Sequence, residues 1–393
     1  MNMERHLKLY ARGLRPLSEV SPRPFVGRIC EDAASPLAAD VLLSRYPSRA
    51  LSPGFRAYLL HEGGDVIDVV GPDTYILPPE LHYLEAGDVV RIDPQRRTVS
   101  ALYRRGSGSN SLLVTERCDN YCVMCSQPPK AVDDSWVLRE LMTEVIPLIS
   151  TEAREIGITG GEPALLGDGL VGLLALLKQK LPTTAVHVLS NGRRFSQTDF
   201  ARAVADVAHP DLMFGIPVYS DLPEEHDYVV QAHGAFDETV RGIINLKRDG
   251  VRVELRFVVH AETYKGLSNF AEFVARNLVF VDHVAIMGLE PTGFAKTNLD
   301  ALWVDPLDYQ NELVAAVHRL ARARLNVSVY NLPLCLLQPE LHRFARKSIS
   351  DWKNVYFDEC SACARRHDCA GFFASSATRR SRGITPFAGA SPE

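Results

Sequence analysis

The chain of 393 residues lacks the features that would place it in a membrane, outside the cell or on nucleic acid. No stretch approaches the ~18 consecutive apolar residues of a membrane-spanning helix. Charged residues interrupt every apolar run within residues 1–17, so this segment does not have the pattern of a secretory signal. The formal net charge of −5 gives no overall positive field to attract nucleic acid. These absences predict a cytoplasmic protein with neither a membrane nor a nucleic-acid partner.

The chain also lacks the cysteine pattern of a disulfide framework. Seven of its 8 cysteines fall into two groups, one within residues 118–125 and the other within 335–369. Grouped cysteines in a chain of this size are typical of metal ligation in a reducing compartment. The remaining one, Cys30, is isolated, and we expect it to be a small buried side chain.

The first cysteine group follows a short apolar segment at 112–114. Cys118, Cys122 and Cys125 have the spacing C-x3-C-x2-C, so three thiolates on one loop can converge on one metal centre. A closed tetrahedral site normally takes four cysteine or histidine ligands, and no fourth lies nearby in the sequence. The loop therefore predicts a metal centre with one coordination position open to a cofactor or a substrate.

Alternating strand-like and helix-like segments predict the fold of the middle of the chain. The expected strands are 112–115, 155–159, 186–190, 213–218, 253–259 and 283–287, and the expected helices are 137–148, 169–180, 200–208, 235–249 and 267–277. Regular alternation gives a parallel sheet with right-handed crossovers. Six such units make a partial, open α/β barrel. Its site would lie at the carboxyl ends of the strands, where the cysteine loop begins.

The N-terminal part differs in character. Residues 1–105 contain frequent prolines and glycines between short strand-like runs, at 66–70 and in an expected hairpin of 89–93 with 98–103. These features predict a small, mostly antiparallel β domain. The polar segment 104–111 is expected to be a flexible connector.

The C-terminal part carries the second cysteine group. We expect a core at 106–300 followed by an extension at 301–393. Within this extension the pattern predicts a helix at 306–324, a strand at 327–330 and a loosely docked tail from Ser375.

A polar motif, Gly160-Gly161-Glu162-Pro163, ends the second expected strand. Paired glycines let the backbone approach a ligand closely. Glu162 then offers a carboxylate that suits an ammonium group on a cofactor, and Pro163 stiffens the exit. The alternative is an ordinary turn from strand to helix.

The segment CDNYCVMC after the first strand, with GGEP after the second, resembles the radical S-adenosylmethionine (radical SAM) superfamily. The resemblance covers about residues 111–290 and implies a partial (β/α)6 barrel. It implies that Cys118, Cys122 and Cys125 hold a [4Fe–4S] cluster whose open iron chelates the amino and carboxylate groups of S-adenosylmethionine (SAM). An electron from an external donor would break a carbon–sulfur bond to give methionine and a 5′-deoxyadenosyl radical, which abstracts a hydrogen. The alternative is a structural zinc loop.

The resemblance also assigns residues to the cofactor. Gly160, Gly161 and Glu162 would meet the methionine amino group of SAM, and Met124 would lie near its adenine. Less specific candidates follow the third and fourth strands or lie on the fifth: Ser190, Asn191, Ser220 and Arg256. The end of the fourth strand would suit a contact with the ribose of SAM, and Arg256 would suit a contact with the SAM carboxylate. Turn residues and solvated side chains are equally common at such positions.

The second cysteine group comprises Cys335, Cys360, Cys363 and Cys369, which is enough to close a metal site. This group resembles the auxiliary-cluster extension of radical SAM peptide maturases, the SPASM/twitch type. Phe373 stands where a full pattern has a further cysteine, so the resemblance implies one auxiliary [4Fe–4S] cluster rather than two. The alternative is a zinc site with four cysteine ligands, which metal analysis would distinguish.

Three longer segments, ERCDNYCVMCSQPPK, MGLEPTGFAKTN and KSISDWKN, resemble the C-component maturases of the His-Xaa-Ser repeat peptide system. This resemblance implies a ribosomally made peptide substrate and a sister radical SAM protein as a partner. The alternatives are a small molecule or a tRNA base as the substrate, or a metal-binding partner subunit without catalytic activity.

Overall fold

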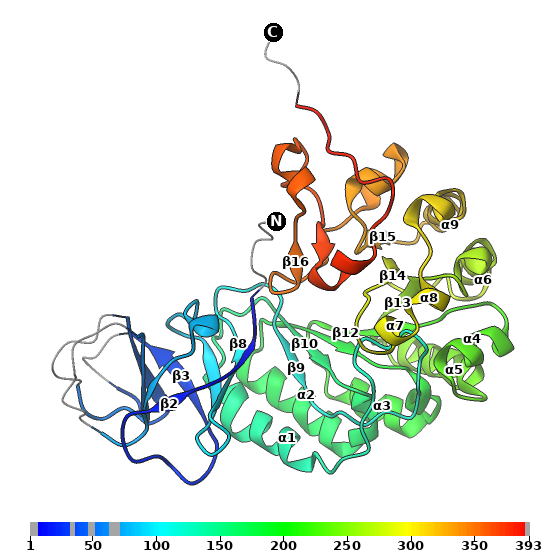
Figure 1. Cartoon of the computed structure of the whole chain (residues 1–393). Coiled ribbons are helices and arrows are strands. Elements are labelled where there is room, and N and C mark those ends of the chain that lie inside the picture. The colour runs from blue at the N-terminus through cyan, green and yellow to red at the C-terminus, as the bar shows by residue number, and fades with distance from the viewer. Residues whose placement is uncertain (1–6, 32–35, 46–51, 63–70, 390–393) are drawn as a thin grey trace.

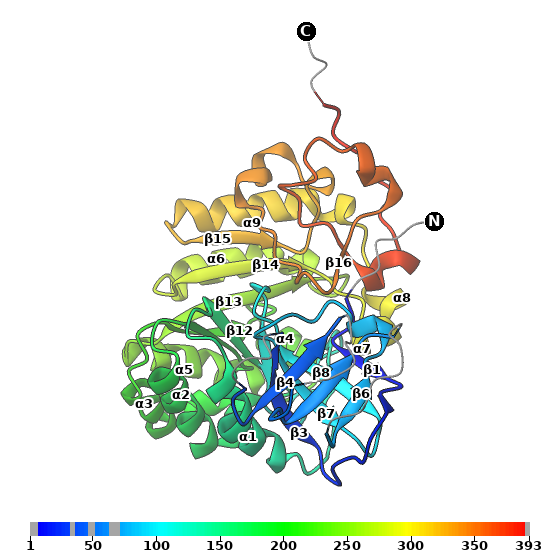
Figure 2. The ribbon, with the colours of Figure 1, turned by 90° about the vertical axis from the view of Figure 1, so that its left-hand side faces the viewer.

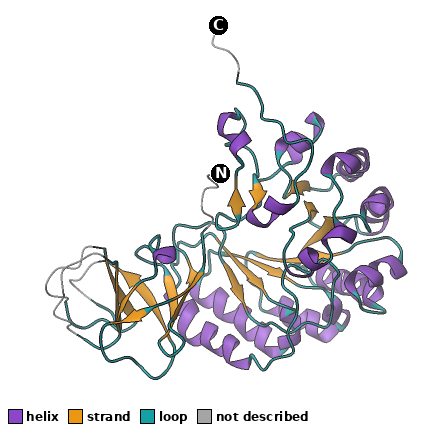
Figure 3. Ribbon diagram, in the orientation of Figure 1, coloured by secondary structure: helices purple, strands orange, loops and turns teal. Residues whose placement is uncertain are grey.

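Two β-sheets of different kinds organise the structure. It is a computed structural model that describes residues 7–31, 36–45, 52–62 and 71–389. The N-terminal sheet lies at one side of a parallel sheet, helices line the outer face of that parallel sheet, and a C-terminal extension lies at its far end (Figure 1, Figure 3). Both sheets were expected from the sequence, and the parallel one carries the candidate site.

The parallel sheet has seven strands in the order of the sequence. They are β9 (Ser111–Leu113), β10 (Glu155–Thr159), β11 (Ala185–Leu189), β12 (Leu212–Pro217), β13 (Arg252–Val259), β14 (His283–Gly288) and β15 (Val327–Tyr330). All neighbouring strands pair in parallel, and β9 and β15 form the two edges. The predicted α/β fold with an open parallel sheet is confirmed. Because β15 pairs with β14, the sheet continues past residue 300.

Helices connect the strands and cover one face of the sheet (Figure 1). The α-helices are α1 (Ser135–Glu140), α2 (Asp168–Lys180), α3 (Thr198–Asp206), α4 (Pro223–Val230), α5 (Ala235–Arg248), α6 (Leu267–Asn277), α7 (Gly293–Thr297), α8 (Leu299–Leu302) and α9 (Gln310–Arg322). Shorter turns of 3-10 or π-helix are η1 (Pro79–Leu81), η2 (Leu141–Val145), η3 (Ile146–Leu148), η4 (Pro163–Leu166), η5 (Arg193–Ser196), η6 (Tyr264–Gly266), η7 (Pro306–Tyr309), η8 (Leu334–Leu336), η9 (Pro339–Phe344), η10 (Asp358–Ala362) and η11 (Ala374–Thr378). The helix expected at 137–148 therefore changes form after Glu140, and the one expected at 306–324 begins as the turn η7.

The main hydrophobic core lies between the sheet and these helices. Successive strand residues point to opposite faces, so every second one faces the helices. On β13 these residues include Leu255 and Phe257, and the ring of Phe257 lies 4.6 Å from that of Phe270 on α6. Burial of each such side chain contributes about 1.5–3 kcal/mol. The opposite face, called here the inner face, is left for polar groups.

The N-terminal sheet has eight strands: β1 (Tyr10–Arg12), β2 (Arg15–Pro16), β3 (Phe25–Cys30), β4 (Asp40–Ser44), β5 (Ala57–Leu60), β6 (Thr74–Ile76), β7 (Val89–Asp93) and β8 (Thr98–Tyr103). Strands β7 and β8 form the predicted antiparallel hairpin. Four of the seven neighbouring strand pairs in this sheet are antiparallel, but the sheet is mixed, because β3, β4, β5 and β6 pair in parallel. Parallel neighbours need a crossover connection, which short strand signals do not reveal. The strand expected at 66–70 lies outside the described residues.

The connector at 104–111 is tied down rather than flexible. The Asn110 side chain accepts a hydrogen bond from the backbone N–H of Arg104 at 2.8 Å and donates to its carbonyl at 2.9 Å. Arg104 and Ser107 then reach Asp351 in the extension, at 2.8 and 3.1 Å. These contacts join the two flanking parts of the chain across the edge of the parallel sheet.

The C-terminal extension contains a two-stranded antiparallel sheet, β16 (Asn354–Val355) with β17 (Phe372–Phe373). It lies beside β14, β15 and α9 (Figure 2). The tail after Ser375 is docked, contrary to the expectation. Its arginines pair with carboxylates that follow α7: Arg379 with Asp300, and Arg382 with both Asp305 and Asp308. Within the described ranges, no helix has the length and apolar character needed to cross a membrane.

Candidate metal and cofactor site at the carboxyl edge of the sheet

The cysteine loop follows β9 at the carboxyl edge of the parallel sheet, and its three thiols are half-buried. Burial raises the pKa of Cys118 to about 12 and also raises the pKa of Cys122 and Cys125. The other two thiols raise the pKa of Cys122 further, so the three sulfurs lie within electrostatic reach of one another. Metal ligation requires thiolates, which a positively charged centre would stabilise at this position.

The donor set therefore fits the cluster that the sequence predicts, with three soft sulfur ligands on one loop. In the described part of the chain, no group of three or more His, Cys, Asp or Glu side chains is arranged to hold a single metal ion. The assignment of the three cysteines as cluster ligands stays a prediction.

Two glycines after β10 pack directly against the entrance of the cysteine loop. The Gly161 N–H donates to the Thr115 carbonyl at 2.8 Å, and the Glu162 N–H donates to the Arg117 carbonyl at 2.7 Å. A Cβ atom on Gly160 would lie 2.4 Å from the Thr115 oxygen, and one on Gly161 would lie 2.1 Å from the Arg117 oxygen. The paired glycines are thus required for close approach of two protein backbones. This role is independent of any contact with a ligand.

The Glu162 side chain is buried and joins the ends of two strands. Its carboxylate accepts hydrogen bonds from the Ala164 N–H at 2.8 Å, the Ser190 hydroxyl at 2.7 Å and the Asn191 N–H at 2.5 Å. Burial raises the pKa of Glu162 to about 7, although these three donors favour its charged form. A carboxylate has about four acceptor positions, so one remains for a further donor. Pro163 is buried and begins η4 directly after this carboxylate.

The segment after β11 binds the cysteine loop from the opposite side. The Asn191 amide donates to the Asp119 carboxylate at 2.6 Å. Arg193, two residues later, reaches the Asp119 carbonyl at 2.9 Å and the Asn120 side chain at 2.7 Å. Asn191 was predicted from the sequence, whereas Asp119, Asn120 and Arg193 were not. The available signal was that Asp119 and Asn120 lie between two cysteines and that Arg193 lies two residues after Asn191.

Further contacts hold the second half of the cysteine loop. The Tyr121 and Val123 N–H groups donate to the carbonyls of Val230 and Val229 at the end of α4, each at 3.0 Å. At α7, the Phe294 N–H donates to the Cys125 carbonyl at 2.8 Å. Gly293 has a positive φ of 55°, and a Cβ there would lie 2.5 Å from the same carbonyl. The loop is therefore fixed along its length by segments distant in the sequence.

The base of the cysteine loop rests on a buried carboxylate that sequence analysis missed. Asp134 accepts hydrogen bonds from the Thr115 hydroxyl at 2.8 Å and the Glu116 N–H at 2.5 Å. Its other side lies 3.4 Å from the Arg117 guanidinium. Asp134 therefore fixes the three residues that precede Cys118.

The remaining candidate residues occupy different surroundings. Met124 is buried in a cluster with Tyr219, Val229, Val230, Ala235, Ala295 and Leu302. The Ser220 hydroxyl donates to Glu225 at 2.7 Å and accepts from the Leu222 N–H at 3.1 Å, which is the arrangement of a turn residue. Arg256 lies on the inner face, where its guanidinium donates to Glu254 at 2.6 Å. The structure brings the cysteine loop, Glu162, Ser190 and Asn191 together, whereas Ser220 and Arg256 are bonded to other groups.

Polar groups from four strands meet around Glu254 on the inner face. Glu254 accepts from Arg256, contacts His283 at 2.6 Å and lies 3.6 Å from His187. His283 continues the network to Ser328 at 2.9 Å. Burial alone would raise the pKa of Glu254, but His283, Arg256 and His187 together lower it to about 2. Because the Glu254 carboxylate is paired with Arg256 and bonded to His283, its charge can be buried on the inner face.

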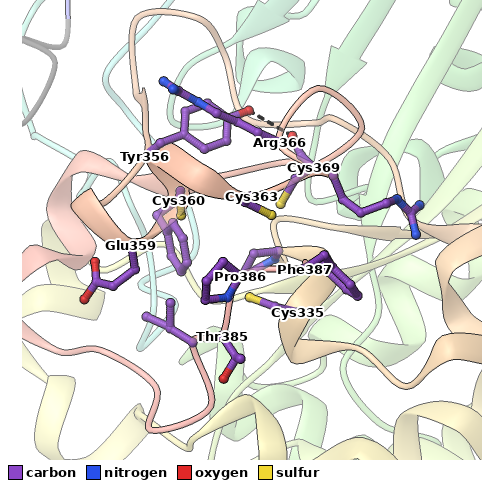
Figure 4. A pocket seen from close by; sticks show the side chains of 14 residues that line it. Cys335, Tyr356, Glu359, Cys360, Cys363, Arg366, Cys369, Thr385, Pro386 and Phe387 are labelled. Carbon is purple, nitrogen blue, oxygen red and sulfur yellow. Dashed lines mark hydrogen bonds between the residues drawn. The ribbon is translucent and has the colours of Figure 1, made fainter. Parts of the chain in front are cut away.

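The second cysteine group surrounds a small pocket in the extension. Cys335, Cys360, Cys363 and Cys369 all line this pocket, which the tail segment 384–387 also borders. Figure 4 shows Pro386 and Phe387 beside Cys335 and across the pocket from Cys369. The Ala364 N–H donates to the Phe387 carbonyl at 3.0 Å, which ties the tail to the loop between the cysteines. Four cysteines are the ligand number of either a cluster or a zinc ion, although their sulfurs are not arranged around a single ion in this structure.

Comparison with protein families identifies the core. The segment 112–274 matches the model of the Radical SAM superfamily. Residues 112–274 form a radical SAM superfamily domain. This domain contains the cysteine loop, the GGEP motif, Ser190, Asn191 and Arg256, and it ends within α6.

Two curated relatives are similar to part of this chain. GTP 3',8-cyclase from Peptoclostridium acidaminophilum is 27% identical over 136 residues, which are 34% of this chain and 40% of that protein. Fe-coproporphyrin III synthase from Methanosarcina barkeri is 26% identical over 159 residues, 39% of this chain and 37% of that protein. The chain thus spans about two-fifths of the length of each relative. The crystal structure of Streptococcus suis SuiB bound to S-adenosylmethionine aligns with a TM-score of 0.42 and 14% identity, over 56% of this chain and 49% of SuiB.

The backbone contact at Gly161 can be tested by adding a single methyl group. In Gly161→Ala, the new Cβ must displace the Arg117 carbonyl, so we expect the free energy of unfolding to fall by about 1–3 kcal/mol. Gly108→Ala is the matched control, since a Cβ at Gly108 meets no atom within 4 Å, and its effect should stay within about 0.5 kcal/mol. Urea unfolding of both variants measures the difference. Equal stability would contradict the packing role.

Proposed function

We propose that this protein cleaves SAM reductively and uses the resulting radical to modify a ribosomally made peptide of the His-Xaa-Ser repeat type by hydrogen abstraction. The observation that carries the proposal is the three-thiol loop at the carboxyl edge of the sheet, inside a radical SAM superfamily domain. Ligand sites of parallel α/β sheets lie at this edge. The loop is also held from several sides, as a precisely positioned centre requires.

In this proposal Cys118, Cys122 and Cys125 hold a [4Fe–4S] cluster with an open iron position. The bound cluster and SAM supply one-electron chemistry that ends in a 5′-deoxyadenosyl radical. The chain's own task is to bind and orient. Glu162 has one acceptor position left for the amino group of SAM, beside backbone fixed by Gly160 and Gly161.

Other residues would complete the SAM site. Ser190 and Asn191 hold Glu162 in place, and Met124 contributes an apolar wall. For Ser220 and Arg256, direct contact with SAM would require exchange of their present partners Glu225 and Glu254. We therefore expect these two residues to support the surrounding structure more than the cofactor.

We further propose that Cys335, Cys360, Cys363 and Cys369 hold an auxiliary [4Fe–4S] cluster. The four sulfurs line one pocket, and the extension that carries them resembles that of peptide maturases. The peptide substrate and a sister radical SAM protein as partner rest on the three longer sequence segments described above. An external electron donor is required because cleavage of SAM consumes an electron.

A second candidate function keeps the chemistry and changes the substrate to a small molecule. It is favoured by the two curated relatives, whose names refer to GTP and to a coproporphyrin. Both relatives match less than two-fifths of this chain.

Metal analysis tests the auxiliary site. In anaerobically prepared protein, Cys360→Ala with Cys363→Ala should remove about half of the iron, because one of two four-iron clusters is lost. Iron and zinc per chain are measured by elemental analysis, with Cys30→Ala as the control. An unchanged iron content with loss of bound zinc would instead establish a structural zinc site.

The cysteine loop is tested by SAM cleavage. The triple variant Cys118→Ala, Cys122→Ala, Cys125→Ala should form no 5′-deoxyadenosine above the background without protein, because no ligands remain for the cluster. Chromatography of reactions with a chemical reductant measures the product. Cys30→Ala should retain native activity. A triple variant as active as the native protein would eliminate this centre as the source of the radical.

The substrate class is tested by isotope transfer. A peptide with His-Xaa-Ser repeats, deuterated at carbon, should transfer deuterium into 5′-deoxyadenosine in the reduced protein, as mass spectrometry would detect. A scrambled deuterated peptide is the control. If native protein cleaves SAM but neither peptide transfers deuterium, the peptide assignment fails and small-molecule candidates follow.

A further inference from the structure

Arg193 lies where the segment after β11 meets the cysteine loop, and its side chain is only 16% exposed. Its Nη1 donates to the Asp119 carbonyl at 2.9 Å and to Oδ1 of Asn120 at 2.7 Å, and it lies 3.3 Å from the Asp119 carboxylate. Asp119 and Asn120 directly follow the first cysteine of the loop. One guanidinium thus binds two of the three residues that lie between Cys118 and Cys122.

The contact with Asn120 also fixes the orientation of its amide. Because Oδ1 accepts from Arg193, the NH2 group of this buried amide points away from the guanidinium. The Asn120 backbone N–H lies 3.4 Å from the Cys118 sulfur, in position to donate. Asn120 therefore places a backbone donor at the Cys118 sulfur, and Arg193 holds Asn120 in place.

Glu238 on α5 completes the arrangement. Its carboxylate accepts from Nε of Arg193 at 2.6 Å, on the side opposite the cysteine loop. An arginine can serve these partners because its fork has donors in fixed, divergent directions, whereas a lysine ammonium is a single point charge. The guanidinium also lies near enough to Cys118 to interact with a charge on its sulfur.

We propose that Arg193 is a positioning residue of the metal centre, which holds Asn120 as a backbone donor to the Cys118 sulfur and places a positive charge against the loop between Cys118 and Cys122. The inference rests on the proposed function, since it takes the three cysteines as ligands of an iron–sulfur cluster. Hydrogen bonds to cysteine sulfurs and nearby charge set the reduction potential of such clusters. Both effects favour the reduced, more negative cluster, so Arg193 makes reduction by an external donor easier.

The test replaces Arg193 and measures the cluster itself. In Arg193→Gln, we expect the midpoint potential of the SAM-responsive cluster to become more negative, because a charge and an oriented donor are both lost. Arg193→Lys retains the charge but not the fork, so its shift should be smaller. Potentials come from reductive titration followed by electron paramagnetic resonance, and iron per chain is measured alongside.

Two further variants separate positioning from a general loss of stability. Glu238→Asp retains Arg193 and the negative charge but shortens the anchor of Arg193, so its potential should shift in the same direction by less than in Arg193→Gln. Arg241→Gln, at an exposed arginine on the same helix, should keep the native potential. Thermal unfolding of the cluster-free proteins shows whether any variant fails to fold. If Arg193→Gln does not fold, the potential of Glu238→Asp is the deciding measurement.

The outcomes are distinct. A native potential and native iron content in folded Arg193→Gln overturn the positioning role and leave the proposed function intact. A native potential in Glu238→Asp does the same when Arg193→Gln does not fold. A native protein that assembles no iron–sulfur centre and cleaves no SAM overturns both together.

Discussion

The close contact between two backbone segments, 115–117 at the entrance of the cysteine loop and 160–162 at the end of β10, is the constraint on which the candidate site depends. Two hydrogen bonds of 2.7 and 2.8 Å join these segments, and both glycines are needed because a Cβ would overlap a carbonyl oxygen. Since β9 and β10 are adjacent in the sheet, their parallel pairing continues into the loops that follow them. The cysteines are thereby positioned by contacts between backbone atoms, which do not depend on the rotamer of any side chain.

Polar side chains extend this contact to the neighbouring strands. Glu162 accepts hydrogen bonds from the end of β11, and Asn191 and Arg193 from the same segment bind Asp119 and Asn120. A buried carboxylate is costly without hydrogen-bond donors, so Glu162 is stable only when the end of β10 meets the end of β11. The same requirement makes the site cooperative: displacement of one loop leaves buried polar groups on the other two unpaired.

The flanking parts are attached more firmly than their composition indicates. The C-terminal tail is basic and rich in small residues, yet Arg379 and Arg382 find acidic partners at Asp300, Asp305 and Asp308. Through this docking, residues 384–387 come to border the pocket of the second cysteine group. The connector is ordered in a similar way, by the side chain of Asn110.

The sequence by itself determined the α/β core, because apolar segments with strand and helix periodicity are local signals, and the strands of the parallel sheet lie within two residues of their expected positions. It also determined the thiol donors, since the spacing of Cys118, Cys122 and Cys125 confines them to one loop. The tertiary structure decided what surrounds them. The pairing of Gly161 with Arg117, and of Arg193 with Asn120, joins residues that are 44 and 73 positions apart. Such contacts depend on the order and register of strands in the finished sheet, which no local pattern encodes. For the same reason the parallel pairs of the N-terminal sheet were not foreseen, because the direction of a strand is fixed by its partners and not by its own residues.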